Sequence, residues 1–598
     1  MNEQVLREFI TAVKAGRVSR RTFTRTMVGL GLTASFVGQL RAHAGLAQSP
    51  TPVEYTPTQA GGGGAPRTLF WQAPTLLNPH FAVGAKDAEG AGIFYEPLAA
   101  WDPDGNLVPV LAAEIPDIEN GGVAADGMSV TWKLKLKAGV QWHDGRPFTA
   151  DDVVFNWEYA SDPATAATTI GSYQDVEVEK IDAFTVRVRF TKPTPFWAGR
   201  ANALIIPKHL FATYKGANSR EAPANLKPVG TGPYRLVDFA PGDFVKGERN
   251  AAYHVPNRPY FDTIEVKGGG DAVSAARAVI QTGDFDFAWN TQVEDEVLLK
   301  LENSVHAKGR VEIVSGMQIE HIQINTADPW TEVDGERSSA KTKHPLFSDP
   351  AVRRALSLLV DRASIQAHIY GRTGVATVNF INSPDRFVSK NTKWECSIDK
   401  ANQLLDEAGW QRGPNGIRAK GGKKLKLVFQ TSINAPRQKT QAIVKQACQR
   451  AGIDMELKSI TPSVYFSSDA ANPDTARKFY ADIQMLNTGV GAPPDPEGLM
   501  RRFLSSEIAA KENKWQRGNS TRWRNEAYDN LFHAAEGELD PVKRAALFIA
   551  INDMVVGDGV VIPVVCRPQV SAISKRLRAT LSGWDSIFWN LKDWYREE

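Results

Sequence analysis

The residue types that perform catalysis or hold metals are spread through this sequence one at a time. A nucleophile, a general base or a metal site needs serine, histidine, cysteine or acidic side chains at spacings that bring them together. The chain has no Gly-x-Ser-x-Gly, no His-Glu-x-x-His and no Gly-x-x-x-x-Gly-Lys-Ser/Thr pattern. None of its ten histidines has another histidine three or four positions away. We therefore expect no catalytic residue, no metal and no cofactor.

Three short patterns resemble binding motifs but are better explained as turns. Val229-Gly-Thr-Gly-Pro-Tyr234 is glycine-rich, yet no lysine completes a phosphate cradle, so we expect a tight turn before a strand that starts at Tyr234. Asp102-Pro-Asp-Gly-Asn106 hints at a calcium loop, but Ala113 stands where a bidentate glutamate is needed. A hairpin turn fits better there. His143 in Trp-His-Asp-Gly fits a turn between a strand and a helix.

Tryptophan is more informative than the charged residues. The chain has fifteen, and several stand where a strand ends or a loop begins: Trp71, Trp289, Trp330, Trp584 and Trp589. Such residues often pack a core, but they also suit a cleft that holds an uncharged or amphipathic small ligand.

Size and composition narrow the class of protein. At 598 residues the chain is too long for one simple core, so we expect two or three domains. A net charge of +3 and the lack of a basic patch argue against nucleic-acid binding. The sequence contains no run of about 18 apolar residues, so it predicts no membrane span. The cysteines Cys396, Cys448 and Cys566 allow either one disulfide with one free thiol or three free thiols.

The first residues have the order of an export signal. A segment rich in arginine and lysine comes first, a weakly apolar run follows, and small residues near 42–47 could be cleaved. Within it, Ser19-Arg20-Arg21-Thr-Phe-Thr-Arg25 resembles the twin-arginine signal. We expect a signal peptide over 1–47, a flexible linker over 48–65 and a mature protein that is free in the periplasm. An amphipathic first helix is the alternative.

The elements after the linker alternate between strands and helices. Apolar residues at every second position predict strands over 129–137 and 184–190. Thr149 and Asp152 have the spacing of a capping box before a helix. Asp349 followed by Pro350 predicts another helix start, and Ser397 a third, with Gly409 as its stop. This order predicts an α/β chain with several sheets.

Long collinear motifs resemble one family. Residues 132–156, from Trp-Lys-Leu-Lys through Trp-His-Asp-Gly-Arg-Pro-Phe to Asn, resemble the signature of ABC-transporter extracellular solute-binding proteins, family 5, the oligopeptide, dipeptide and nickel class. Segments 228–239, 280–287 and 347–362 match the same family in the expected order. The resemblance covers about residues 66–595.

This resemblance implies a periplasmic binding protein of type II, with two lobes joined by a hinge and a small extra α/β domain. Lobe I would comprise 66–105, 229–325 and 560–598, with the extra domain inserted as 106–228. Lobe II would comprise 326–559. Ligand binding would close the lobes about crossings near Asn325 and Val560.

The resemblance also bears on the ligand. In peptide-binding members, an aspartate four residues before a proline holds the peptide amine, and the matching position before Pro496 is Ala492. Asp495 could replace it, but a turn residue is the better interpretation. A buried ammonium without a carboxylate is unfavourable. Peptides bound through a free amine therefore become less favoured than an opine, a sugar conjugate, a modified peptide or an aromatic compound.

We expect the cleft to be lined by aromatic and neutral polar groups from four segments. The candidate ligand-binding residues are Phe81, Ala82, Val83, Trp289, Asn290, Glu320, His321, Gln323, Asn487, Thr488 and Gly489. We predict that Trp289→Ala weakens binding roughly thirtyfold with little change in folding stability.

The predicted function is that of a monomeric periplasmic receptor that delivers a small or peptide-like solute to an ABC permease in the membrane. The alternatives are a secreted hydrolase and a chaperone or signalling module on the same fold. The solute and the permease are not specified by the sequence.

Overall fold

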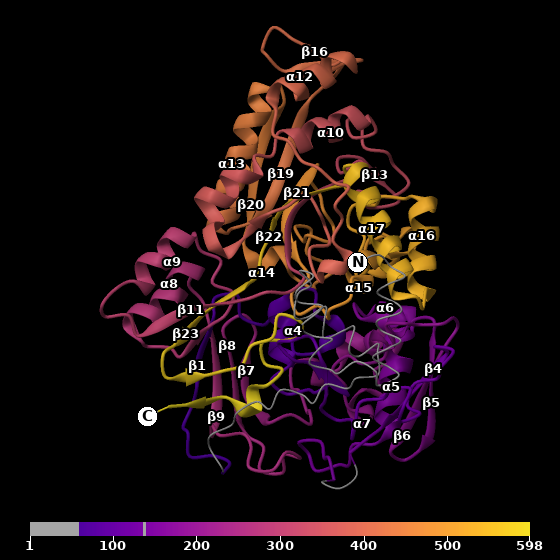
Figure 1. The fold of residues 1–598 in the computed structure, drawn as a ribbon, viewed down its shortest axis with the longest axis vertical. Helices are drawn as coiled ribbons and strands as arrows, with labels where there is room; N and C mark the ends of the chain where they lie inside the picture. Colours follow the sequence, from indigo (N-terminus) through magenta and orange to yellow (C-terminus); the bar gives the residue numbers. More distant parts are fainter. Residues whose placement is uncertain (1–58, 136–138, 598) are drawn as a thin grey trace, which may run out of the picture.

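Two large sheets and a smaller third one organise the protein (Figure 1). The computed structural model describes residues 59–135 and 139–597. The predicted signal peptide and residues 48–58 of the predicted linker lie outside the described residues. Within the described part of the chain, no helix is both long enough and apolar enough to cross a bilayer.

The first sheet has seven strands and a parallel centre. Strand β1 pairs in parallel with β9 and β10, whereas β23 runs antiparallel to β10 and β11. Helix α8 (Ala272–Arg277) packs its alanines on one face, and α9 (Asp295–Glu302) lies beside it. The strands in spatial order are β11 (Gly309–Val314), β23 (Gln569–Ser574), β10 (Phe287–Ala288), β1 (Arg67–Phe70), β9 (Thr263–Gly268), β8 (Phe244–Arg249) and β7 (Tyr234–Ala240).

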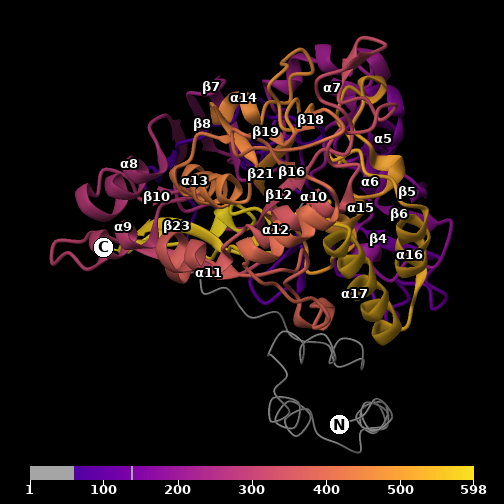
Figure 2. The same ribbon diagram turned by 90° about the horizontal axis from the view of Figure 1, so that it is seen from above.

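The second sheet has six strands and its own core. Helices α10 (Pro350–Leu358), α12 (Ile398–Glu407) and α13 (Ala435–Arg450) supply the buried side chains that pack on it. The strands in spatial order are β15 (Val375–Ala376), β22 (Val561–Cys566), β12 (Ile319–Ile324), β21 (Ile483–Thr488), β19 (Lys426–Ser432) and β20 (Asp454–Ile460). Seen from above, α10, α12 and α13 lie over these strands (Figure 2).

The predicted helix starts are confirmed. The Asp349 side chain accepts from the backbone N–H of Ala351 at 3.0 Å, with Pro350 as the first residue of α10. Ser397 caps α12 in the same way. Thr149 and Asp152 form the expected capping box of α5 (Ala150–Ser161). Each cap satisfies backbone donors that a helix start leaves without intrahelical partners.

The third sheet lies within 106–228, the region predicted to be an inserted domain, and we use that name for these residues. Strand β6 (Thr185–Phe190) lies between β4 (Ser129–Lys133) and β5 (Val176–Asp182), so the two predicted strands are direct neighbours. Val130 and Trp132 of β4 are fully buried, as the alternating pattern predicts. Helix α5 packs against β5 and β6. The small helices α6 (Ile170–Tyr173) and α7 (Lys208–Phe211) pack near it.

The chain passes between the two large sheets at 315–318 and at 567–568 (Figure 1). These positions differ from the predicted boundaries near Asn325 and Val560. Strands β12 and β22 were expected in lobe I, but they pair with each other in the six-stranded sheet, beginning with Ile319 opposite Cys566. We call 315–318 and 567–568 the two crossings. They lie side by side, because the backbone N–H of Arg567 donates to the carbonyl of Gln318 at 3.1 Å.

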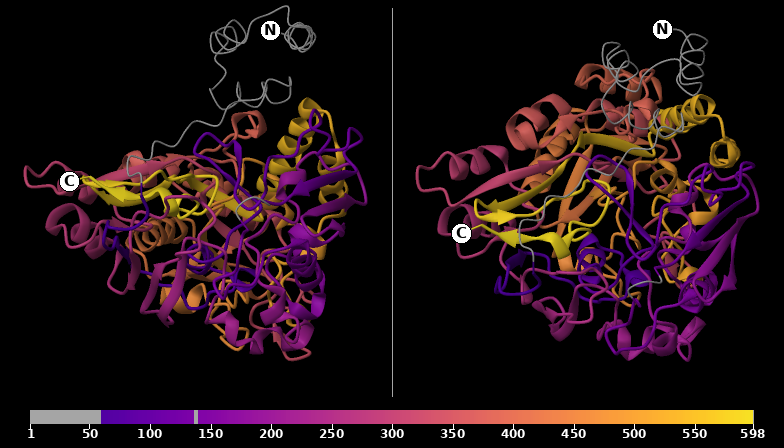
Figure 3. Two further views of the ribbon diagram at one scale, coloured as in Figure 1. Left: turned by 90° about the horizontal axis from the view of Figure 1, so that it is seen from below. Right: turned by 60° about the horizontal axis from the view of Figure 1, so that its bottom comes forward.

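The last strands, β24 (Leu577–Arg578) and β25 (Tyr595–Arg596), form a hairpin-like pair on the side of the seven-stranded sheet (Figure 3). All three cysteines are free thiols: Cys448 is buried, Cys566 is half-buried and Cys396 is exposed.

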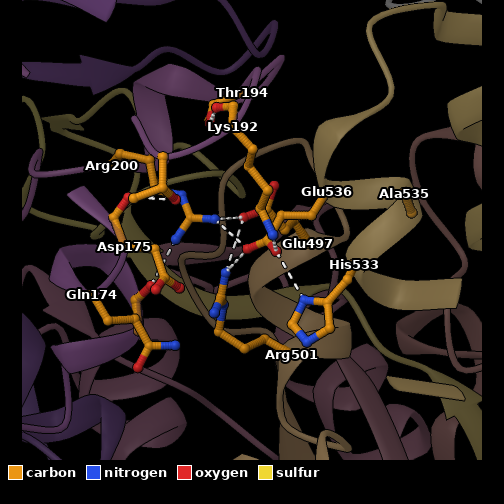
Figure 4. A network of polar contacts seen from close by, with 12 residues as sticks. Gln174, Asp175, Lys192, Thr194, Arg200, Glu497, Arg501, His533, Ala535 and Glu536 are labelled. Atoms are coloured by element: carbon orange, nitrogen blue, oxygen red, sulfur yellow. Dashed lines mark hydrogen bonds and ion pairs between the residues drawn. The ribbon is translucent and has the colours of Figure 1, made fainter. Parts of the chain in front are cut away.

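We call the parts of the chain built on the seven-stranded and six-stranded sheets the first and second large units. A buried ion network ties the inserted domain to the second large unit (Figure 4). Arg200 of the inserted domain donates to Glu497 and to Glu536, each at 2.5 Å. Lys192 also binds Glu536, and Arg501 binds both glutamates. Glu497 and Arg501 belong to α15 (Glu497–Arg501), and Glu536 belongs to α16 (Glu526–Gly537), which packs on α17 (Pro541–Gly557).

Candidate ligand-binding site at the crossings

Four of the predicted site residues come together where the two crossings meet. Trp289 and Asn290 directly follow β10 of the seven-stranded sheet. Glu320 of β12 stands opposite Asn487 of β21 in the six-stranded sheet. We call the group formed by Asn290, Gln318, Glu320, Arg437, Asn487 and Arg567 the junction cluster.

A buried ion pair anchors the junction cluster on the side of the six-stranded sheet. Arg437, in the first turn of α13, donates through Nε and Nη2 to the two oxygens of Glu320 at 3.0 and 2.9 Å. Its Nη1 donates to the Ser432 hydroxyl at 2.8 Å. Burial raises the pKa of Glu320, but Arg437 and Arg567 outweigh burial and hold that pKa below its ordinary value. The carboxylate is therefore ionised and fully used by the protein.

Arg567, in the second crossing, reaches both sheets. Its Nη2 donates to Asn290 Oδ1 and to Gln318 Oε1, each at 3.1 Å, and its Nη1 lies 3.4 Å from Glu320 Oε1. Asn487 Nδ2 donates to the same Gln318 oxygen at 2.7 Å. Burial lowers the pKa of Arg567 to about 10, which still leaves the guanidinium charged at neutral pH.

Several buried polar atoms around the junction cluster have no protein partner. They come from the residues just after β10, from β21 and β23, from both crossings and from the helical turn that ends at Tyr370. The atoms are Trp289 Nε1, Thr291 Oγ1, Gln318 Nε2, Tyr370 Oη, Asn487 Oδ1, Arg567 Nε, both amide atoms of Gln569, and Ser571 Oγ. Buried polar groups in folded proteins nearly always have partners, so a concentration of exceptions points to a site that a ligand completes.

Trp289 packs differently from the prediction. Its indole stacks on Phe70 at 4.9 Å between ring centroids, within the core of the seven-stranded sheet, and only 2% of the residue is exposed. Removing such a side chain from a core destabilises the fold, so we replace the expectation of little change in stability by an expected loss. Its indole N–H has no acceptor, so contact with a ligand through that N–H stays a prediction.

The segment at 81–83 meets the second large unit at another place. The backbone N–H of Val83 donates to Ser468 Oγ at 3.3 Å, although the two residues are far apart in the sequence. Phe81 is buried below Arg220, whose guanidinium lies 3.9 Å from the ring centroid, and the Ala82 carbonyl accepts from Thr168 at 3.2 Å. Phe81 and Ala82 therefore contact the inserted domain, and of these three residues only Val83 bonds to the second large unit.

His321 and Gln323 are not brought to the junction cluster. Adjacent residues of a strand point to opposite faces, so His321 cannot share the face of Glu320. His321 packs edge-on against Phe380 at 5.0 Å, and burial lowers its pKa to about 4. Gln323 accepts from Gln484 at 2.9 Å and from Ser520 at 2.7 Å.

The end of β21 explains the remaining predicted residues. Thr488 is buried beside the first crossing, since it pairs with Ile319. Gly489 has φ +86°, and a Cβ there would lie 2.4 Å from the Met317 carbonyl oxygen, so only glycine fits. Asp495 accepts from Arg544 Nη2 at 2.9 Å and from the Glu497 N–H at 3.0 Å. Its carboxylate is thus engaged in the turn, as predicted, while Ala492 packs against a core.

The three motif-like stretches form turns. Asp102 accepts from the backbone N–H groups of Asp104 and Asn106 in the hairpin that joins β2 (Ala99–Trp101) to β3 (Leu107–Pro109). His143 bonds the backbone of Gly230 and Gly232 next to the start of β7. Among the described residues, no group of three histidine, cysteine or acidic side chains could hold a metal. A separate cavity of about 40 Å³ near Glu96 and Trp589 is lined by residues of the first large unit and of the inserted domain, and by none of the junction cluster.

Sequence reasoning missed Gln318, Arg437, Arg567 and Gln569. Arg567 carried a usable signal, because a charged residue followed by proline interrupts two apolar strands, 561–566 and 569–574. A charge there must be buried and needs partners. Arg437 is recognisable only as one of several basic residues near a helix start, and its pairing with Glu320 spans 117 positions.

Comparisons with known proteins agree with this architecture. The family description "Bacterial extracellular solute-binding proteins, family 5 Middle" matches residues 106–511, more than half of the chain. The oligopeptide-binding protein AppA of Bacillus subtilis (strain 168) is 28% identical over 448 residues, 73% of this chain and 75% of AppA. The glutathione-binding protein GsiB of Escherichia coli (strain K12) is 25% identical over 504 residues, 84% of this chain and 89% of GsiB.

The fold is also that of a solved relative. The structure of AppA from Bacillus subtilis in complex with a nonapeptide superposes with a TM-score of 0.76 and 22% identity, covering 91% of this chain and 100% of that one. Two large α/β units joined by two adjacent crossings, an inserted third sheet and the family match lead to one conclusion. The chain belongs to the bacterial extracellular solute-binding proteins of family 5.

Proposed function

We propose that this protein is the solute-binding receptor of an ABC importer, which captures a small solute between its two large units and delivers it to a membrane permease. The observation that carries this proposal is the concentration of buried, unpartnered polar atoms at the crossings. A ligand placed there contacts both units at once, and closure around it follows from contacts that only the closed form can make.

The solute is peptide-like or of similar size. AppA and GsiB are named for binding an oligopeptide and glutathione, which supports this class. Two features disfavour recognition through a free amine: Ala492 stands at the expected anchor position, and Asp495 is paired with Arg544. Modified peptides, opines, sugar conjugates and aromatic compounds remain in the class.

The proposed place of action is the periplasm, with removal of the segment 1–47 on export. The working unit is a monomer, and the permease is a transient partner. This assignment rests on the family membership and on the order of charged, apolar and small residues at the start of the chain.

Calorimetry against a solute library tests the receptor function, with small-angle scattering on every solute that binds. We expect one class of solute to bind with a single site per chain and to lower the radius of gyration. Saturating binding with an unchanged scattering profile would argue against closure. Turnover of a chromogenic ester or glycoside, or preference for unfolded chains over every small solute, would contradict the receptor function.

A further inference from the structure

The crossings and the residues Trp289 and Gln569 beside them carry more hydrogen-bond donors than the protein satisfies. Arg567 Nε, Gln318 Nε2, Gln569 Nε2 and Trp289 Nε1 are all donors without an acceptor. Each of these residues is at most 4% exposed. The unpartnered atoms there that only accept are Asn487 Oδ1 and Gln569 Oε1. Donors therefore exceed pure acceptors, and the missing partner is rich in acceptor atoms.

The same place holds an excess of positive charge. Glu320 is the carboxylate that faces Arg437 and Arg567, and Arg437 takes both of its oxygens. Arg567 lies 3.4 Å from one Glu320 oxygen, and its other partners are the neutral side-chain amides of Asn290 and Gln318. Neutral amides solvate a cation but do not neutralise it. Glu320 is shared between two buried arginines and cannot neutralise both, so a negative group on the ligand would stabilise Arg567.

The neighbouring charged groups do not remove this excess. Lys439 pairs with Glu294 at 2.5 Å. Arg372 pairs with Asp295 at 2.7 Å and also binds Glu302. Both pairs join the two large units beside the crossings, but each acidic group there already has a basic partner.

Backbone pairing explains why the donors lie near one another. Ala288 pairs with Ala572, which places the next residue, Trp289, beside Ser571. Thr291 N–H donates to the Val570 carbonyl at 2.9 Å, so this alignment continues toward Gln569. Gln569 follows Arg567 by two positions, and Gln318 is bonded to Arg567 through both backbone and side chain.

We propose that the crossings form a carboxylate-binding subsite, in which Arg567 and Gln318 hold an acidic group of the solute with help from Gln569 and Trp289. This inference rests on the proposed receptor function and adds the charge of the solute to it. A free amine on the solute is not required. Gln318 lies in the first crossing and Arg567 lies in the second. An acid bound to both therefore bridges the two segments about which the units close.

Four compounds on one scaffold test the charge requirement in the full-length protein. They are alanyl-phenylalanine, its N-acetyl derivative, its carboxamide and the N-acetyl carboxamide. They combine the presence or absence of an amine with that of a carboxylate. By calorimetry we expect the N-acetyl acid to bind at least tenfold more tightly than the N-acetyl carboxamide. Removal of the amine alone should change affinity less than removal of the carboxylate.

Gln318→Glu provides the matching variant. It keeps the oxygen that accepts from Arg567 and Asn487, and it places a carboxylate of the chain beside Arg567. We expect the ligand-free variant to melt at or above the temperature of the parent, whereas its affinity for the N-acetyl acid falls at least tenfold. Arg567→Gln should lose the acid to a similar extent. Arg310→Gln, on β11 with a side chain 39% exposed, is the control and should bind as the parent does.

The outcomes separate this inference from the receptor function. Equal binding of acid and carboxamide, or undiminished acid binding by Gln318→Glu, overturns the carboxylate subsite and leaves the receptor intact. If the protein binds other solutes in the library screen but not the N-acetyl acid, the carboxylate subsite is also overturned and the receptor function stands. A protein that binds nothing in either experiment contradicts the receptor function itself.

Discussion

At the scale of single residues, Trp289 shows what a sequence pattern conveys and what it omits. The predicted strand end is confirmed, since Trp289 directly follows β10 and its neighbour Asn290 accepts from Arg567 of the second crossing. The stack on Phe70 was not predictable, because it depends on which strands become neighbours across 219 positions of sequence. The ring therefore serves the core, and its N–H is the part left for a ligand.

Trp289→Phe separates these two roles. Phenylalanine keeps an aromatic ring against Phe70 but removes the indole N–H. We expect solute affinity to fall about fivefold to tenfold, the size of one hydrogen bond, with a small change in melting temperature. Trp289→Ala should lower both, with a loss of folding stability of about 3–5 kcal/mol. Calorimetry and thermal melting measure the two effects, and unchanged affinity in the phenylalanine variant would show that the N–H does not touch solute.

Glu89 gives a residue-level prediction about pH. It lies buried in α4 (Ala85–Ala91) and accepts from the Ile587 N–H at 2.9 Å and from the Ser586 hydroxyl. Burial raises its pKa to about 8, so the folded protein keeps the proton that the unfolded chain loses above its ordinary value of 4.5. Folding stability from this group therefore decreases as the pH rises from about 4.5 to about 8.

Glu89→Gln should reduce the dependence of folding stability on pH between about 4.5 and about 8. The amide oxygen can accept the same two hydrogen bonds and carries no charge. We expect the variant to be more stable than the parent at pH 8 and close to it at pH 5, as measured by chemical unfolding at both values. Glu114→Gln, at an exposed ion pair with Lys133, is the control. An equal effect of Glu89→Gln at both pH values would rule out the raised pKa.

At the scale of elements, local signals predicted where helices begin better than which sheet a strand joins. Caps at Thr149, Asp349 and Ser397 are short-range chemistry, and all three helices begin where expected. Membership of a sheet is decided by pairing over hundreds of residues, as between Ile319 and Cys566. For that reason the predicted boundaries assigned β12 and β22 to lobe I, whereas both strands belong to the six-stranded sheet. Sequence reasoning named Asn290, Glu320 and Asn487 but missed the other members of the junction cluster for the same reason, since its six residues come from five separate segments.

The ion network of Figure 4 yields a prediction at this scale. Arg200→Met would leave Glu497 and Glu536 buried with fewer cationic partners, and breaking a buried pair typically costs about 3–5 kcal/mol. We expect the inserted domain to detach more readily from α15 and α16, seen as faster amide exchange in both. Arg187→Met removes a half-exposed partner of Glu179 in the same domain and should have little effect. Equal exchange in the two variants would contradict a stabilising role for the network.

At the scale of the whole molecule, family membership and architecture were predictable from long collinear motifs. The motifs at 132–156 and 347–362 contain the turns, caps and buried strands that define the units, so they report the fold. They contain none of the junction cluster, so the residues that identify the family are not the residues that meet at the crossings.

Export is the prediction that concerns the whole chain. Replacing Arg20 and Arg21 with lysine should leave precursor in the cytoplasm, because the twin-arginine pathway distinguishes the planar guanidinium from an ammonium. Cell fractionation followed by immunoblotting measures this. Normal amounts of mature protein in the periplasm of the lysine variant would show that another route is used. Replacing Arg17 with lysine, outside the pair, is the control.

The ion network between the inserted domain and α15–α16 has a kinetic consequence. We expect the inserted domain to move with the seven-stranded sheet, so opening pulls Arg200 and Lys192 away from Glu497 and Glu536. Coulombic attraction weakens steeply once water enters between the charges and raises the local dielectric constant. The barrier to release then lies within the first ångströms of separation. Solute residence time should respond to substitutions in this network even though none of its residues belongs to the junction cluster, and it should depend little on ionic strength while the charges stay buried.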